Sequence, residues 1–236
     1  MSLSLKPKEQ SPVRTAKNLQ QQAYNFVKAH IMNRSLKPGQ PITDGQIADQ
    51  LNISRTPVRE AFYLLEHEGL LIRQDKRGWK VYSLSLEDIT EIFDIKVQLE
   101  GLIARRAAEC KDEGKRAALK DLVERMKQAS ACNDHEAWRQ ADMDLHHVIF
   151  DMAGNERASH IINNLNAQWY RLRIGLVAME GRVERSNREH EGIVSSILIR
   201  DGNEAERQMR SHLNDLREEL VRVLTHLVFP FVEKGI

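Results

Sequence analysis

Apolar residues recur at helical spacing in the first part of the chain, where two interruptions separate them into groups. Between positions 18 and 33 they fall three or four residues apart, which predicts a helix. The pair Pro38-Gly39 ends that helix, because proline cannot continue it and glycine favours a turn. Thr43 and Gln46 have the spacing of a capping box and predict the start of a second, short helix.

A third helix and a pair of strands follow. Either Ser54 or Thr56 can cap the start of the predicted helix, which ends at Gly69. Only about three residues separate it from the second helix, a spacing typical of a helix-turn-helix. Residues 70–73 and 80–83 then predict two strands joined through 75–78, with a glycine available for the turn. This hairpin is the wing of a predicted winged helix.

After residue 84 only helical periods remain. Six stretches can be marked, separated by Gly, Asn and Asp positions: 86–110, 113–130, 134–153, 156–180, 186–200 and 203–228. The predicted fold class is therefore mainly α, with an N-terminal winged helix-turn-helix (three helices plus the β-hairpin wing) and then an all-helical bundle of six or seven antiparallel helices. The predicted domains are a flexible basic arm (1–17), a DNA-binding winged helix (18–84) and an effector-binding and dimerisation bundle (85–232).

Charge is distributed unevenly between these parts. Residues 1–84 hold 13 Lys and Arg against 7 Asp and Glu, whereas residues 85–236 hold 22 against 27. The basic first part suits a polyanionic partner, although chance variation in surface charge gives the same numbers. The two cysteines do not form a disulfide framework, and no signal peptide or membrane span is present, so we expect a cytoplasmic protein with no membrane partner.

The exposed face of the third predicted helix is short, polar and positive, as a helix that enters the major groove requires. Arg55 and Arg59 lie one turn apart, and each suits a guanine or a phosphate. The remaining predicted DNA contacts are helix-start hydroxyls and wing residues: Ser54, Thr56, Lys76, Arg77, Gly78 and Lys80. The alternative is that Arg59 pairs with Glu60 or Glu66 as ordinary surface charge and that the module contacts protein.

Several motifs in order resemble the winged helix of the GntR family of transcription regulators. They are Leu36-Lys-Pro-Gly39, Gln46-Ile-Ala-Asp-Gln-Leu51, Ser54-Arg-Thr-Pro-Val-Arg-Glu-Ala61, Leu64-Leu-Glu-His-Glu-Gly-Leu70 and Arg77-Gly-Trp-Lys-Val81. The resemblance implies binding of a double-stranded, palindromic operator by a homodimer. It also implies that Arg55, Thr56, Arg59 and Gly78 occupy DNA-contacting positions.

Four ionisable residues share apolar stripes in the predicted bundle. Asp142 and His146 lie one turn apart, and His190 and His212 lie on two later helices. Burying such groups without partners is costly, and one divalent metal satisfies all four. Zinc is the first choice, with nickel, iron or manganese as alternatives. The other interpretation is that each histidine is satisfied separately by backbone or by another histidine.

The same spacing resembles the FCD domain of the FadR-type branch of the GntR family, and six helices would suit its VanR-like subgroup. The resemblance implies a metal that anchors a small organic acid or sugar acid. At a position where the family often has arginine, this chain has Lys96. Lys96 lies on the apolar stripe of its helix, so we expect its side chain to point inward. Arg173 is a second candidate for an anionic effector. For both residues, a salt bridge inside the bundle is the alternative.

The sequence thus predicts a DNA-binding transcription regulator, a repressor rather than an enzyme, whose bundle binds a divalent metal and a carboxylate that modulates operator binding. Two alternatives stay open at this point. In one, the metal itself is the signal. In the other, the chain is a metal-dependent hydrolase with a DNA-targeting module, since an open coordination position can also activate water.

Overall fold

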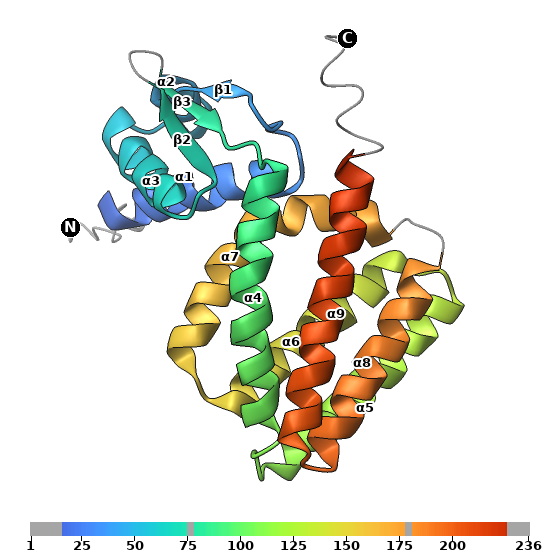
Figure 1. Ribbon diagram of the computed structural model, residues 1–236. Helices are drawn as coiled ribbons and strands as arrows, with labels where there is room; N and C mark the ends of the chain where they lie inside the picture. The colour runs from blue at the N-terminus through green and yellow to red at the C-terminus, as the bar shows by residue number, and fades with distance from the viewer. Residues whose placement is uncertain (1–15, 75–77, 178–180, 226–236) are drawn as a thin grey trace, which may run out of the picture. The chain divides into compact units, whose positions relative to one another are not determined.

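The computed structural model describes residues 16–74, 78–177 and 181–225 (Figure 1). The chain divides after Ser83 into two compact units. Within the described ranges the first unit holds three helices and a small sheet, and the second holds six helices. This confirms the predicted fold class, and six helices of the bundle lie within the residues that the structure describes. No helix in these ranges is long and apolar enough to cross a membrane.

The first unit is a winged helix. Its elements are α1 (Ala16–Met32), β1 (Pro41–Ile42), α2 (Asp44–Leu51), α3 (Arg55–His67), β2 (Leu71–Gln74) and β3 (Gly78–Val81). The predicted hairpin is the antiparallel pair β2–β3, and β1, which was not predicted, pairs with the other edge of β3. A strand of two residues is too short to show an alternating pattern. The helix α1 begins two residues before its predicted start, and the rest of the predicted basic arm lies outside the described residues.

Local signals fix the turn between α2 and α3. Thr43 and Gln46 form both hydrogen bonds of the predicted capping box at the start of α2. Asn52 ends α2 in a left-handed conformation, with φ of 51°, which asparagine tolerates better than most residues. Phe62 of α3 and Trp79 of β3 meet edge to face in the core, with ring centroids 5.6 Å apart. The core therefore holds α3 against the sheet while its opposite face stays exposed.

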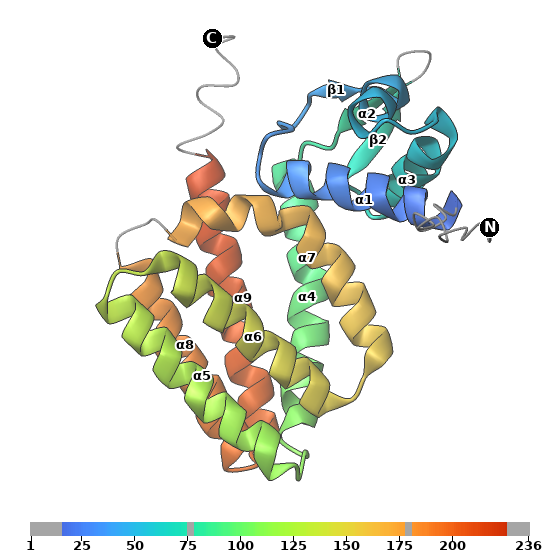
Figure 2. The same ribbon diagram turned by 180° about the vertical axis from the view of Figure 1, so that it is seen from behind.

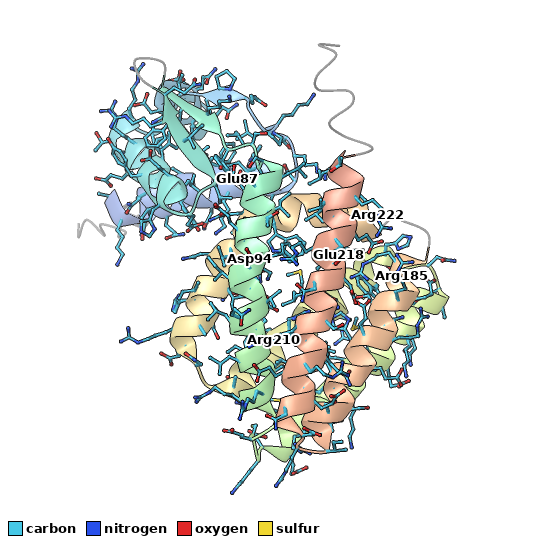
Figure 3. The ribbon with its side chains drawn as sticks, in the orientation of Figure 1. Glu87, Asp94, Arg185, Arg210, Glu218 and Arg222 are labelled. Atoms are coloured by element: carbon cyan, nitrogen blue, oxygen red, sulfur yellow. The ribbon has the colours of Figure 1, made fainter. Side chains whose placement is uncertain are left out.

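The second unit is a helical bundle. Its helices are α4 (Leu86–Ala107), α5 (Glu113–Ala131), α6 (His135–Ala153), α7 (Glu156–Val177), α8 (Arg182–Leu198) and α9 (Gly202–Val223). Helices α4 and α9 run side by side in opposite directions (Figures 1 and 2). Gly101 of α4 permits their close approach, since a Cβ there would lie 2.9 Å from the side chain of Arg210 on α9, which Figure 3 labels.

Most helix boundaries in the bundle lie within a few residues of their predicted positions. Among the helix starts, the largest difference is at α8, which begins at Arg182 instead of 186. Gly181 precedes it with φ of 69°. The first turn of α8 is rich in charged residues, so the hydrophobic pattern does not indicate where the helix starts. The earlier start brings Arg182 into the bundle, where it is buried.

Candidate functional site

The predicted DNA-contacting residues that the structure describes lie on the exposed side of α3 and on β3. Ser54 is the N-cap of α3, and its hydroxyl makes no capping hydrogen bond. Arg55, Thr56 and Arg59 are exposed, as Ser54 is, while Gly78 and Lys80 on β3 are partly exposed. Lys76 and Arg77 lie outside the described residues, so their predicted contacts stay predictions.

Arg59 has a partner that the sequence did not suggest. Its Nε and Nη2 atoms both donate to Oδ2 of Asp44, at 3.1 and 2.6 Å, and Asp44 is the first residue of α2. Glu60 and Glu66, the two partners considered from sequence, are not the ones it uses. Hydrogen bonding to Asp44 raises the pKa of Arg59. The guanidinium is thus held at one edge while its side chain remains 56% exposed.

Gly78 has a structural reason for being glycine. Its φ of +88° is unfavourable for residues with a side chain, and a Cβ would lie 3.3 Å from the carbonyl oxygen of Ile42 in β1. The fold therefore requires glycine at this position. The predicted approach of the Gly78 backbone to DNA remains a prediction.

Three histidines from three helices meet inside the bundle. His146 of α6, His190 of α8 and His212 of α9 each offer a ring nitrogen, and the three nitrogens lie within 4.8 Å of one another. His190 and His212 are buried, and His146 is partly buried. Asp142, one turn before His146, is also buried, and its Oδ1 lies 3.4 Å from Nε2 of His190. The structure therefore brings three of the four predicted metal ligands into one cluster and places Asp142 beside one of them, His190.

Hydrogen bonds fix the protonation of two of these rings. The Nδ1 of His190 lies 2.8 Å from the backbone oxygen of Ser186, which can only accept, so this nitrogen carries the proton. The Nδ1 of His212 likewise lies 2.7 Å from Oε2 of Glu189 and donates to it. In its neutral form each ring then has its lone pair on Nε2, the arrangement that outer partners impose on metal-binding histidines.

His146 completes the set beside a buried carboxylate. Its Nδ1 lies 3.6 Å from Oε2 of Glu100, and its Nε2 lies 3.1 Å from Nε2 of His190. Burial is the main cause that lowers the pKa of His146; Lys96 lowers it too, while Glu100 opposes them. The ring is therefore neutral at pH 7. To direct a third lone pair to the common centre, it must carry its proton on Nδ1, on the side of Glu100.

The donor set and its spacing fit a divalent metal. Two imidazole nitrogens bound to one zinc ion at about 2.0–2.1 Å, at angles of about 90–110°, lie roughly 2.8–3.4 Å apart. The Nε2 atoms of His146 and His190, at 3.1 Å, fall in this range, and so does the 3.4 Å between His190 and Asp142. Imidazole with one carboxylate suits zinc, nickel, iron or manganese.

Comparison with known proteins covers both units. Residues 19–81 match the family described as bacterial regulatory proteins of the gntR family, and residues 91–215 match the FCD domain. The HTH-type transcriptional regulator YdhC of Bacillus subtilis is 30% identical over 205 residues, which cover 86% of this chain and 91% of YdhC. The chain is a GntR-family regulator with an FCD domain. The hydrolase alternative is thereby removed, because the family regulates transcription and is not enzymatic.

Two further comparisons extend this GntR-family assignment. The HTH-type transcriptional repressor RspR of Escherichia coli is 28% identical over 203 residues, which cover 86% of this chain and 89% of RspR. The solved structure of E. coli McbR/YncC matches with a TM-score of 0.71 at 21% identity, covering 86% of this chain and 97% of that one. This last likeness shows a common fold.

A cavity of about 330 Å³ lies beside the histidines of this GntR-family regulator. Its lining includes Asp142, His146 and His212 together with Asn163, Asn166 and Trp169 of α7. The wall therefore combines the candidate metal ligands with amide and aromatic side chains, which is the composition of a small-molecule site.

Lys96 lines the cavity, and a neighbouring carboxylate neutralises its positive charge. It points inward as predicted, is 2% exposed, and forms a salt bridge with Glu100 one turn later. Its Nζ also donates to Asn166 and lies 5.5 Å from the centre of the Trp169 ring. The structure thus contains the salt bridge that the sequence offered as the alternative for Lys96. The side chain of Arg173 lies outside the described part of the structure.

Three charged residues of the site were missed by sequence reasoning. Glu100 shares the inward stripe of Lys96, so the i, i+4 spacing could have indicated it. Glu189 gave no signal, because its role depends on α9 lying beside α8. Arg182 lines the cavity and pairs with Glu189 and with Glu219, at 3.4 and 3.2 Å. The regulator thus has a buried guanidinium in the wall as well as Lys96.

Proposed function

We propose that this GntR-family regulator is a repressor whose FCD domain binds a divalent metal ion and a small carboxylate metabolite, and that the metabolite lowers operator affinity. The observation that carries the proposal is the convergence of His146, His190 and His212, with Asp142 adjacent, beside a cavity of about 330 Å³. A cavity next to the metal ligands favours an organic effector over a metal that acts alone as the signal.

The chain's own side chains orient the proposed ligands. Glu189 and the backbone of Ser186 hold the protons on Nδ1 of His212 and His190, so that both rings direct Nε2 to one centre. Zinc is the first choice for this set of donors. When bound, the metal would supply a Lewis-acid centre that binds a carboxylate oxygen of the effector. Asn163 and Asn166 line the rest of the cavity and suit hydroxyl and carboxylate groups, whereas the charge of Arg182, which also lines it, is matched by Glu189 and Glu219.

Lys96 contributes differently from the sequence-based proposal. Because Glu100 neutralises it, we expect it to position Asn166 and Glu100 rather than to bind an acid through its own charge. The predicted effector role of Arg173 stays a proposal. A small organic acid or sugar acid remains the proposed class, since hydroxyl groups would meet the amides of α7 and one carboxylate would meet the metal.

In this proposal, ligand binding changes the arrangement of the helices that carry the metal ligands. Ligands from α6, α8 and α9 fix these helices to one centre, and Glu100 connects His146 to α4. Helix α4 follows the winged helix directly in the chain. A ligand can shift operator affinity only if it binds two arrangements of these helices unequally, so the acid must contact more than one of them.

Regulators of this family typically act as dimers on operators, and we propose a homodimer on a palindromic site. Exposed apolar side chains on two helices support a contact between copies. Ile95 and Leu102, two turns apart on α4, are 46% and 39% exposed, and Ile161 on α7 is 48% exposed. The proposed DNA surface of each copy consists of Ser54, Arg55, Thr56, Arg59, Gly78 and Lys80, together with Lys76 and Arg77.

Calorimetric titration tests the effector proposal. A panel of organic and sugar acids is titrated into protein loaded with Zn²⁺ and into the same protein kept in chelator. We expect at least one acid to bind the loaded protein and to give no heat of binding in chelator. Equal binding to both forms would contradict the proposal, as would a loaded protein that binds no acid in the panel.

A further inference from the structure

Two hydrogen-bond donors fix the side chain of Asn166 on the wall of the cavity beside the histidines. The Nζ of Lys96 and the Nε1 of Trp169 both donate to its Oδ1 atom, the second of them at 3.1 Å. An ammonium group and an indole N–H can only donate, so the atom that they contact must be the amide oxygen and not the nitrogen. These two contacts therefore determine which way the amide of Asn166 is turned.

The two donors are themselves held in place. Lys96 is buried and forms its salt bridge with Glu100 on the same helix. Trp169 is buried as well, and its ring meets the ring of Phe93 edge to face, with centroids 5.2 Å apart. Neither donor can turn away without leaving a buried polar group unpaired or a gap in the core. The orientation of the Asn166 amide is thus set before any ligand binds.

The amide nitrogen of Asn166 remains available to a ligand. Its Nδ2 atom carries two hydrogens, which make no hydrogen bond to any residue that the structure describes. Asn166 lines the cavity, and its Nδ2 atom is not sealed in the interior. A donor whose orientation is fixed in advance loses little entropy when it binds an acceptor oxygen. The cavity therefore presents an oriented pair of uncharged N–H donors.

These donors are separate from the proposed metal centre. Lys96 contacts Oε1 of Glu100, and Oε2 of Glu100 lies 3.6 Å from Nδ1 of His146. Lys96 and Glu100 thus connect Asn166 to the far side of the His146 ring, away from the Nε2 atom that would bind the metal. A carboxylate on the metal leaves the Asn166 amide to another oxygen of the same molecule. Because the amide is neutral, it suits an uncharged hydroxyl or carbonyl oxygen.

We propose that Asn166 determines the specificity of the effector site, by donating to a hydroxyl or carbonyl oxygen that is separate from the carboxylate on the metal. The inference rests on the proposed function of the cavity and narrows its ligands to hydroxy acids and oxo acids. Lys96 is a positioning residue here, since it orients the amide and does not bind the effector. A plain aliphatic acid would displace water from the two donors without replacing its hydrogen bonds, which weakens binding.

The experiment compares acids of equal charge and chain length. Calorimetry measures how full-length protein loaded with Zn²⁺ binds each acid of the panel and the plain aliphatic acid of the same length, such as gluconate with hexanoate and lactate with propionate. The variant is Asn166→Asp, which keeps an acceptor oxygen for Lys96 and Trp169 but has no N–H donors. The matched control is Asn164→Asp, which adds the same charge at an exposed position of α7 that does not line the cavity.

We expect the wild-type protein to prefer a hydroxy acid or oxo acid over its plain partner. Asn166→Asp should reduce this preference by about 10-fold, because the added charge repels both monoanions and only the oxygenated acid loses its donors. Asn164→Asp should keep the wild-type preference. Both variants should bind Zn²⁺ stoichiometrically in equilibrium dialysis, since neither position is a proposed metal ligand.

The possible failures can be told apart. An unchanged preference in a folded Asn166→Asp variant that binds Zn²⁺ would overturn the inference and leave the metal and carboxylate site intact. Plain acids that bind wild type as tightly as their oxygenated partners would overturn it too, as would an equal loss of preference in Asn164→Asp. If no acid of either kind binds the Zn²⁺-loaded wild-type protein, the proposed effector function itself fails.

Discussion

Replacing His190 and His212 together by alanine is expected to abolish stoichiometric binding of metal. The two side chains are 1% and 4% exposed and supply two of the three converging imidazoles. Removal leaves His146 and Asp142, both on α6, and two donors do not complete a four-coordinate site. Elemental analysis after equilibrium dialysis against Zn²⁺ measures the effect. Metal content equal to wild type would place the site elsewhere.

Two single variants make this result more specific. Glu189→Gln keeps every proposed ligand but weakens the acceptor that holds the proton on Nδ1 of His212. We expect it to lower metal affinity by about 10- to 100-fold, the usual effect of losing an outer partner of a ligand. His135→Ala removes an exposed histidine from α6, the helix of His146, and should bind metal as wild type does. A loss of metal binding in His135→Ala would show that the assay responds to the total number of histidines and not to the proposed site.

Replacing Glu100 by alanine is expected to destabilise the metal-free protein by about 3–5 kcal/mol, because it leaves Lys96 buried without its carboxylate. Both side chains of the pair are 2% exposed, so the ammonium group of Lys96 would stay almost entirely out of contact with bulk water after its partner is removed. Asn166 and Trp169 contact Lys96 but carry no negative charge. Urea unfolding in chelator measures the free energy of unfolding without a contribution from metal binding.

The double variant Lys96→Met/Glu100→Leu serves as the control for that measurement. Removing both charges avoids the unpaired buried ammonium, and apolar replacements of similar volume often restore stability. We expect the double variant to be more stable than Glu100→Ala alone. Two results would show that the pair is solvated. One is a decrease of less than about 1 kcal/mol in the free energy of unfolding of Glu100→Ala, and the other is a double variant that is less stable than Glu100→Ala.

Local chemistry explains what could be predicted from the sequence. The capping box of Thr43 and Gln46 is a contact between residues three apart, so its spacing alone identifies it. The inward direction of Lys96 follows from its stripe on α4, and His190 and His212 follow from the apolar residues around them. Patterns within one helix therefore predicted both the fold class and the residues that meet in the bundle.

Contacts between elements explain what could not be predicted. Asp44 and Arg59 are 15 positions apart, and their pairing depends on how α2 crosses α3. Glu189 reaches His212 only because α8 and α9 are neighbours. Arg185 and Glu219 join the same two helices, and Figure 3 labels Arg185 on α8. Helical periodicity does not predict such pairs, because each partner occupies a position in its own helix that is typical of an ordinary surface charge.

The most direct test of the proposed regulation is operator affinity measured by fluorescence anisotropy in four conditions, using the duplex that full-length protein selects from a randomised pool. The protein is assayed in chelator, with Zn²⁺, with an acid that binds in calorimetry, and with both. We expect the acid to weaken operator binding only when Zn²⁺ is present, and Zn²⁺ alone to leave it close to the value in chelator. An acid that acts equally in chelator, or Zn²⁺ alone producing the full change, would contradict the account.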